Sequence, residues 1–305
     1  MRYLVTGAAG FIGSHLAETL VAGGHDVAGL DCLTDYYDPA LKEENARGLV
    51  LERVDLAADP LDFSGFDGVF HLAGQPGVRS FGDVFPLYLR RNVLATQRVF
   101  EAAAAAGART VFASSSSIYG EAERYPTPED TVPAPLSPYG VTKLACEHLA
   151  RAYAKGFGLD AVVLRYFTVY GPRQRPDMLF ARVVNALASG GAFEIYGGGD
   201  QSRSFTYVGD TVDATIAAMD SAPTGAVYNV GGGEEATVLE AIALLERISG
   251  RTLDVRHTEA AAGDVSRTAA DVTRIAAELG WAARTPLEAG LKAQWEWAAA
   301  RVAAG

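Results

Sequence analysis

Short apolar runs alternate with longer stretches of helical periodicity along the first half of the chain. Between the runs, apolar residues recur at three- and four-residue steps, as at Ile12, Leu16 and Leu20, which is the spacing of one helix face. The predicted strands are residues 2–6, 26–30, 49–54, 68–72, 110–113 and 160–164. Strands that alternate with helices predict an α/β fold with a doubly wound parallel sheet, which binds ligands at the carboxyl ends of its strands.

The pattern changes after residue 167, where shorter elements follow one another without regular alternation. We predict strands at 193–196, 203–208, 227–230 and 253–256, and helices at 179–189, 211–219, 238–248 and 287–304. We expect residues 1–167 to form one domain, with 205–230 returning to it. Residues 168–204 and 231–305 would then form a smaller α/β substrate-binding lobe.

The first predicted strand runs into a glycine turn and then a helix. Gly7, Gly10 and Gly13 follow the spacing G-x-x-G-x-x-G. The unpaired amides and the dipole of such a helix N-terminus form an anion site, which here suits the pyrophosphate of a dinucleotide. The second strand ends in Asp31, whose carboxylate would accept hydrogen bonds from an adenosine ribose and repel a 2′-phosphate. We therefore predict NAD in preference to NADP.

A serine run and a proline-rich loop lie between another strand and its following helix. Residues 114–117 are all serine, and helical spacing begins after Pro138. Tyr139 and Lys143 are four residues apart at the start of that helix, so they share a face. A nearby ammonium favours the phenolate form of a tyrosine and makes it a usable base, and Ser115 could bridge substrate and phenol. The alternative is a solvated tyrosine and lysine on an exposed helix, so this motif takes its weight from the rest of the chain.

Composition narrows the class of partners. The net charge is −11 without a cluster of Lys and Arg, which argues against nucleic acid and anionic membranes. No apolar run approaches the ~20 residues needed to span a bilayer, and the N-terminus has no leader-like segment, so we expect a soluble cytoplasmic protein. The two cysteines, Cys32 and Cys146, suggest reduced thiols. Neither they nor the five histidines have metal-ligand spacing, so we expect no metal.

Together these motifs resemble the extended short-chain dehydrogenase/reductase family of NAD-dependent nucleotide-sugar epimerases and dehydratases, over nearly the whole chain. The resemblance implies a Rossmann-like sheet in which Tyr139 is the catalytic base, Lys143 tunes it and binds the nicotinamide ribose, and Ser115 is the hydroxyl partner. Asn92 matches a family asparagine beside the site. The residues that match NAD contacts are Gly7, Gly10, Phe11, Ile12, Gly13, Asp31, Asp55, Leu56, Leu72, Ala73, Tyr139, Lys143 and Tyr166.

Ser116 and Ser117 distinguish among the reactions of that family. Family dehydratases carry Asp-Glu at these positions, because eliminating water needs an acid and a base. UDP-glucuronate decarboxylases typically place a Glu where Ser117 stands. The serines therefore favour 4-epimerisation, which consists of oxidation at C4, rotation of the keto-sugar and return of the hydride to its other face.

Two stretches, 35–42 and 167–178, resemble UDP-glucuronate 4-epimerases, which convert UDP-glucuronate to UDP-galacturonate. UDP-glucose 4-epimerases usually carry Asn where this chain has Thr168. A UDP-glucose 4-epimerase stays the main alternative. A decarboxylase, a dehydrogenase and a non-catalytic NAD-binding regulator are further alternatives.

A uronate substrate needs a cation for its carboxylate, and Arg175 or Arg173 could supply a bidentate partner. Our hypothesis is that Arg175, with Thr168 and Ser117, grips the C6 carboxylate. The alternative is an Arg175–Asp177 pair that only stabilises the loop.

The resemblance also implies contacts for the rest of the UDP-sugar. Arg203 matches a diphosphate-binding arginine with Gln201 beside it, Ile195 and Tyr196 lie where the family grips uracil through the backbone, and Asp264 matches a ribose contact. The full predicted substrate set is Gln75, Arg79, Ser116, Ser117, Thr168, Arg175, Ile195, Tyr196, Gln201, Arg203 and Asp264. The family often carries an Arg shortly before the Gly-Asp of that ribose contact, where this chain has alanines, so diphosphate binding would depend more on Arg203.

Helices predicted at 86–106 and 138–155 carry apolar residues on more than one face. In this family such helices pair across a two-fold axis, so the resemblance implies a homodimer.

Overall fold

The computed structural model describes residues 1–77, 82–259 and 265–304. Its central layer is a seven-stranded sheet in which every neighbouring pair is parallel. The strand order is β10 (Val227–Val230), β6 (Ala161–Tyr166), β5 (Arg109–Ser115), β4 (Gly68–His71), β1 (Arg2–Thr6), β2 (Asp26–Asp31) and β3 (Val50–Arg53). The order reverses between β1 and β4, and ligands bind such sheets beyond the carboxyl ends of the strands at this switch point. The predicted doubly wound parallel sheet is confirmed.

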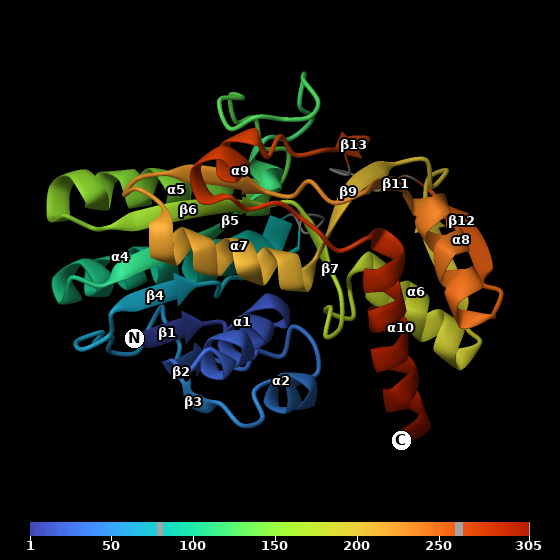
Figure 1. The fold of residues 1–305 in the computed structure, drawn as a ribbon, viewed down its shortest axis with the longest axis horizontal. Coiled ribbons are helices and arrows are strands. Elements are labelled where there is room, and N and C mark those ends of the chain that lie inside the picture. Colours follow the sequence, from blue (N-terminus) through green and yellow to red (C-terminus); the bar gives the residue numbers. More distant parts are fainter. Residues whose placement is uncertain (78–81, 260–264, 305) are drawn as a thin grey trace.

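Helices cover both faces of the sheet, which explains why the central strands read as continuous apolar runs. On one face α1 (Phe11–Ala22), α7 (Val208–Ser221) and α9 (Thr273–Leu279) contribute to a core that includes Leu16, Val212 and Ile275. On the other face α4 (Ala95–Ala106) and α5 (Pro138–Phe157) enclose Val99, Phe100 and Cys146. A short helix, α2 (Pro39–Asn45), follows β2. Figure 1 shows these layers on the left and the smaller part of the chain on the right.

The helix predicted at 86–106 is continuous but not uniform. It begins as α3 (Phe85–Tyr88), passes through a π-helical segment, η2 (Leu89–Leu94), and continues as α4. Such π turns are frequent at functional sites. Here the segment contains Asn92, which is buried against the loop after β4.

The smaller part has its own sheets and core. One sheet contains β7 (Thr168–Tyr170), β9 (Ser202–Tyr207), β11 (Glu235–Thr237) and β13 (Arg267–Thr268); another pairs β8 (Ala192–Tyr196) with β12 (Asp254–Thr258). Three helices enclose an apolar core with these strands, namely α6 (Leu179–Ser189), α8 (Val238–Ser249) and α10 (Leu287–Ala304). Residues 227–230 pair with the central sheet while 202–207 belong to the smaller one. The domain boundaries given above stay a prediction.

No helix in the described part of the chain has both the length and the apolar composition needed to cross a bilayer.

Candidate active site

A cavity of about 710 Å³ opens at the carboxyl ends of the central strands. Its volume falls within the ordinary range for small-molecule and cofactor sites. The lining comes from the glycine turn after β1, the ends of β2, β4, β5 and β6, the start of α5, and the loop after β7. Both the central sheet and the smaller part of the chain therefore contribute residues to one cavity.

The backbone packs closely around the glycine turn, which lines the cavity. Gly7 has φ +73°, and a Cβ placed there would lie 2.9 Å from the backbone nitrogen of Ala73. A Cβ at Gly13 would collide with the carbonyl of Gly7, so α1 can approach the end of β1 because residue 13 is glycine. Gly10 ends this turn as the N-cap of α1. It has no side chain to cap the first amides of the helix, and the start of α1 lines the cavity. The arrangement is that of an anion site.

Asp31 stands at the end of β2 and lines the cavity. Its Oδ1 accepts a hydrogen bond from the amide of Leu33 at 2.8 Å, and its Oδ2 accepts one from the amide of Ala9 at 3.3 Å. These bonds fix the carboxylate beside the glycine turn. The other predicted cofactor contacts that line the cavity are Gly7, Gly10, Phe11, Ile12, Gly13, Asp55, Leu56, Leu72, Ala73 and Tyr166.

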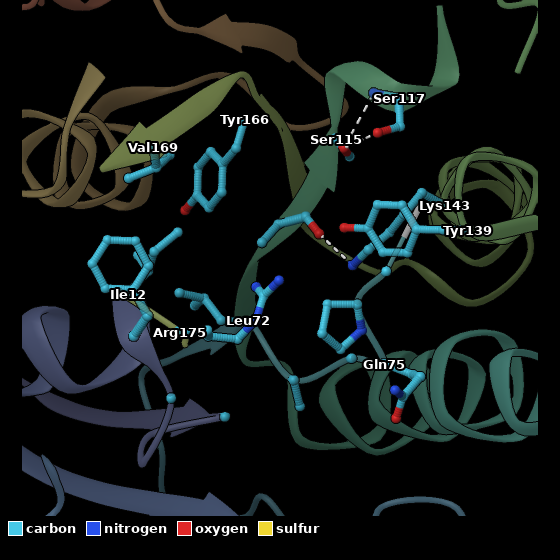
Figure 2. A pocket seen from close by; sticks show the side chains of 18 of the residues that line it. Ile12, Leu72, Gln75, Ser115, Ser117, Tyr139, Lys143, Tyr166, Val169 and Arg175 are labelled. Carbon is cyan, nitrogen blue, oxygen red and sulfur yellow. Dashed lines mark hydrogen bonds between the residues drawn. The ribbon is translucent and has the colours of Figure 1, made fainter. Parts of the chain in front are cut away.

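Tyr139, Lys143 and Ser115 meet on one side of the cavity (Figure 2). Lys143 Nζ donates to the carbonyl of Ala113 at 2.8 Å and lies 5.9 Å from the centroid of the Tyr139 ring. Ser115 Oγ accepts from the amide of Ser117 at 3.1 Å and donates to Ser117 Oγ at 3.1 Å. The helix spacing and the end of β5 therefore bring together a phenol, an ammonium and a hydroxyl, which is a set suited to moving a proton.

The start of α5 lies very close to the serine turn. Ser137 caps the helix by accepting from the amide of Gly140 at 3.1 Å. A Cβ at Gly140 would lie 2.5 Å from the carbonyl oxygen of Ser117. Only glycine at this position lets the helix that carries Tyr139 approach the strand end that carries Ser115.

The buried amide of Asn92 holds the loop after β4. Its Oδ1 accepts from the backbone amide of Gln75 at 2.6 Å, and its Nδ2 donates to the Gln75 carbonyl at 3.1 Å and to Thr142 Oγ1 at 3.0 Å. Arg91 donates to Gln75 Oε1 at 2.8 Å. Asn92 thus joins the π-helical segment, α5 and the cavity-lining Gln75, so it positions the site without itself lining the cavity.

A buried charged network lies behind the same residues. Glu147, one helix turn after Lys143, forms an ion pair with Arg165 at 2.8 Å and accepts a hydrogen bond from Ser114 Oγ at 2.5 Å. Arg165 also donates to the hydroxyl of Tyr119 at 2.7 Å. Burial raises the pKa of Tyr119 to about 12 although the guanidinium of Arg165 acts in the opposite direction, so Tyr119 stays a neutral donor to Asn229.

The two arginines proposed for the substrate carboxylate behave differently. Arg175 lines the cavity and forms a bidentate pair with Asp177, with Nε–Oδ1 and Nη2–Oδ2 distances of 3.0 Å each. Arg173 instead pairs with Glu18 on α1 at 2.8 Å and is not part of the cavity wall among the described residues. The loop pair with Asp177 therefore exists, and it leaves Arg175 at the site.

The remaining predicted contacts divide into three groups. Ser116, Ser117, Thr168, Gln75 and Arg203 line the cavity. Within the described residues the wall does not include Ile195, Tyr196 or Gln201; the Ile195 side chain is buried in the core of the smaller lobe, and Gln201 donates to the Tyr196 carbonyl at 3.0 Å. Arg79 and Asp264 lie outside the described residues.

Sequence reasoning missed several residues of the wall. Tyr36, Lys42, Arg91 and Asp177 all line the cavity. Tyr36 and Lys42 fall in the stretch 35–42 used for the resemblance, but nothing in their spacing gives them a role. Among the described residues, no group of three or more His, Cys, Asp or Glu side chains is placed to hold a metal ion.

Comparisons with known proteins agree with this geometry. The model of the NAD dependent epimerase/dehydratase family matches residues 3–231. A Bacillus subtilis protein named as an uncharacterized UDP-glucose epimerase is 42% identical over 309 residues, which cover 95% of this chain and 96% of that protein. A UDP-glucuronate 4-epimerase of Thermodesulfobacterium geofontis is 36% identical over 310 residues, covering 97% and 95%. The crystal structure of UDP-glucuronic acid 4-epimerase from Bacillus cereus, in complex with UDP-glucuronic acid and NAD, has a TM-score of 0.94 and 38% identity, and covers 98% of this chain and 99% of that one.

Proposed function

Because the chain belongs to the NAD-dependent epimerase/dehydratase family, we propose that it is an NAD-dependent 4-epimerase that converts UDP-glucuronate to UDP-galacturonate. The observation that carries this proposal is the convergence of Tyr139, Lys143 and Ser115 on a cavity that also contains the glycine turn and Arg175. The UDP-glucuronate 4-epimerase of Thermodesulfobacterium geofontis and the Bacillus cereus complex support the choice of substrate.

The glycine turn fits a dinucleotide. Gly7 and Gly13 let the backbone pack closely around the turn, and the start of α1 lines the cavity, where a pyrophosphate could bind its first amides. Asp31 suits the adenosine ribose, and Asp55 and Leu56 line the cavity near it. When bound, NAD supplies the hydride acceptor and donor for C4 of the sugar.

Tyr139 carries the proton of the reaction. As its phenolate it accepts the proton of the C4 hydroxyl when that carbon is oxidised. It returns the proton to the C4 oxygen after the keto-sugar has rotated in the site. Lys143 Nζ lies 5.9 Å from the centroid of the Tyr139 ring, and its hydrogen bond to the Ala113 carbonyl fixes its position. Ser115 would hold the oxygen at C4 between its own hydroxyl and the phenol.

The residues beside this triad favour epimerisation. Elimination of water would need an acid and a base next to Ser115, but Ser116 and Ser117 stand there and line the cavity. The site then has what a reversible oxidation requires and lacks a carboxylate at these two positions.

Arg175, with Thr168 and Ser117, is our candidate for the grip on the C6 carboxylate, and all three line the cavity. An arginine presents a planar fork that matches a carboxylate. The grip has a second consequence, since the 4-keto form of a uronate is a β-keto acid. Holding the carboxylate so that the breaking bond does not align with the ketone would suppress loss of carbon dioxide.

The contacts to the nucleotide stay proposals. We propose Arg203 as the diphosphate contact, which its place in the cavity wall supports; it also donates to the carbonyl of Val265 at 2.7 Å. Tyr196 and Ile195 through their backbone, with Gln201 and Asp264, would complete the UDP site.

We also propose a homodimer. The π-helical segment and α5 expose Leu89, Leu94 and Val141, each between 44% and 47% accessible, which suits a helical interface between two copies. We place the protein in the cytoplasm, because Cys32 and Cys146 are both unpaired, as expected in a reducing compartment.

A UDP-glucose 4-epimerase is the second candidate, since the Bacillus subtilis relative bears that name. The deciding experiment is a proton NMR time course of the purified protein with UDP-glucuronate and no added NAD, with UDP-glucose in a parallel tube. We expect UDP-galacturonate to appear without a UDP-pentose. Turnover of UDP-glucose alone would favour the second candidate, a pentose product would indicate decarboxylation, and retained NAD without turnover would indicate a non-catalytic protein.

A further inference from the structure

Arg175, which lines the cavity, is already paired with one carboxylate. Asp177 binds Arg175 side-on, through Nε and Nη2, at 3.0 Å for both bonds. Both residues line the cavity, and their side chains are 41% and 23% exposed. This pairing uses one edge of the guanidinium, so the edge formed by Nη1 and Nη2 is the one that remains for a ligand. Figure 2 shows Arg175 reaching into the cavity toward the side that Tyr139 occupies.

A third residue fixes this arrangement from the opposite lobe. The hydroxyl of Tyr36, in the loop between β2 and α2, donates to Asp177 Oδ2 at 3.3 Å. Burial and the charge of Asp177 raise the pKa of Tyr36 to about 12, so Tyr36 remains a neutral donor. The Asp177 carboxylate therefore accepts hydrogen bonds from both Arg175 and Tyr36, and all three residues line the cavity.

We propose that Asp177 is a specificity-determining residue, whose charge limits how strongly the site prefers a uronate over a neutral sugar. The inference rests on the proposed function, since it assumes that the C6 carboxylate binds Arg175. With Asp177 in place the pair is neutral overall, and an incoming uronate brings a second carboxylate to the same guanidinium. The two carboxylates repel each other at this range, whereas a C6 hydroxyl meets no such repulsion.

If Asp177 only orients Arg175, removal of its charge should lower the preference for the uronate instead of raising it. If Asp177 only held Arg175 in place, removing its charge would loosen the arginine and weaken uronate binding. The Asp177→Asn change separates the two, because the amide keeps one oxygen that accepts from Arg175 but removes the charge. Since the Asp177 side chain is exposed, we expect this variant to fold.

The chain offers a matched control. Arg173, two positions before Arg175 in the same loop, pairs with the carboxylate of Glu18 at 2.8 Å. Neither residue belongs to the cavity wall among the described residues. The Glu18→Gln change removes a similar charge without touching Arg175. We expect it to leave the discrimination between the two sugars unchanged.

The experiment measures dissociation constants of UDP-glucuronate and UDP-glucose for NAD-loaded protein by calorimetry, in a Tyr139→Phe background that prevents turnover. We expect Asp177→Asn to raise the preference for UDP-glucuronate about three- to tenfold, and more at low salt than at high salt. In the active protein, the same change should appear as a lower KM for UDP-glucuronate. An unchanged or lower preference would overturn the proposal.

Turnover and binding preference test the proposed function and the role of Asp177 separately. If the protein with an intact Tyr139 binds UDP-glucuronate but turns over neither sugar, the proposed function is refuted. The binding preference would still decide the role of Asp177. Turnover of UDP-glucuronate with an unchanged preference in Asp177→Asn would refute the role of Asp177 alone.

Discussion

The hydroxyl of Ser114 donates to the carboxylate of Glu147 at 2.5 Å, inside the buried network of Arg165. Ser114 precedes Ser115 at the end of β5, and Glu147 lies on α5 one turn after Lys143. This bond therefore joins the strand that carries the hydroxyl to the helix that carries the phenol and the ammonium. The relative position of Ser115, Tyr139 and Lys143 therefore depends on a bond between two neighbouring residues, Ser114 and Glu147.

We expect Glu147→Gln to destabilise the fold by roughly 3–5 kcal/mol, because Arg165 would stay buried without its counter-charge. Urea unfolding measures the change. The matched control is Asp254→Asn, whose partner Arg256 is 67% exposed, so that its loss should cost about 0–1 kcal/mol. Equal losses for the two variants would contradict this account of the network.

We expect Gly140→Ala to lower kcat while the protein still folds. The new methyl group would meet the Ser117 carbonyl at 2.5 Å and shift Tyr139 away from Ser115. Steady-state kinetics and a thermal melt measure the two effects. Gly156, on the same helix, has nothing within 4 Å of a built Cβ. Gly156→Ala should keep full activity and stabilise the protein by about 0.5–1 kcal/mol.

His71 predicts a pH dependence of stability. It is fully buried between Thr6 and Thr96, and burial, with a smaller contribution from the charge of Lys143, lowers its pKa to about 3. Below pH ~6.5 the unfolded chain binds a proton at this histidine that the folded protein does not bind. The free energy of unfolding should therefore fall as the pH falls from about 6.5 toward 3, by up to ~1.4 kcal/mol per pH unit.

Urea unfolding between pH 7.5 and 5 measures this slope. His71→Gln should reduce it, because the group that takes up the proton on unfolding is gone. His148 lies on the surface, and His148→Gln should leave the slope as it is in the unmodified protein. An unchanged slope in His71→Gln would show that other groups govern the acid sensitivity.

We expect Arg175→Ala to lower kcat/KM for UDP-glucuronate by roughly tenfold or more, since a charged hydrogen-bonding partner of the carboxylate is lost. The effect on UDP-glucose should be smaller. Parallel kinetics with the two sugars measure the difference. A variant that bound and converted UDP-glucuronate as well as the unmodified protein would make Arg175 structural.

The sequence predicted the parts of the site that depend on local spacing. The glycine turn, Asp31 at a strand end, and Tyr139 four residues before Lys143 are each set by a few neighbouring positions, and the structure places all of them on the cavity. The parallel sheet followed in the same way from short apolar runs that alternate with helices.

Other features depend on contacts between distant segments, so spacing could not predict them. The π turn around Asn92 goes with its hydrogen bonds to Gln75, 17 positions away, and the choice between Arg175 and Arg173 depends on Glu18 of α1. The predicted uracil contacts at Ile195 and Tyr196 were taken from resemblance alone, and the structure places neither in the cavity wall.

In the proposed reaction, C4 of the sugar is oxidised and reduced within one active site. Incubation with UDP-glucuronate carrying deuterium at C4, in ordinary water, tests it by NMR and mass spectrometry of the product. We expect UDP-galacturonate that keeps the deuterium at C4, because the same hydride returns to the other face. A product that has lost the deuterium, or one that has lost carbon dioxide, would contradict it.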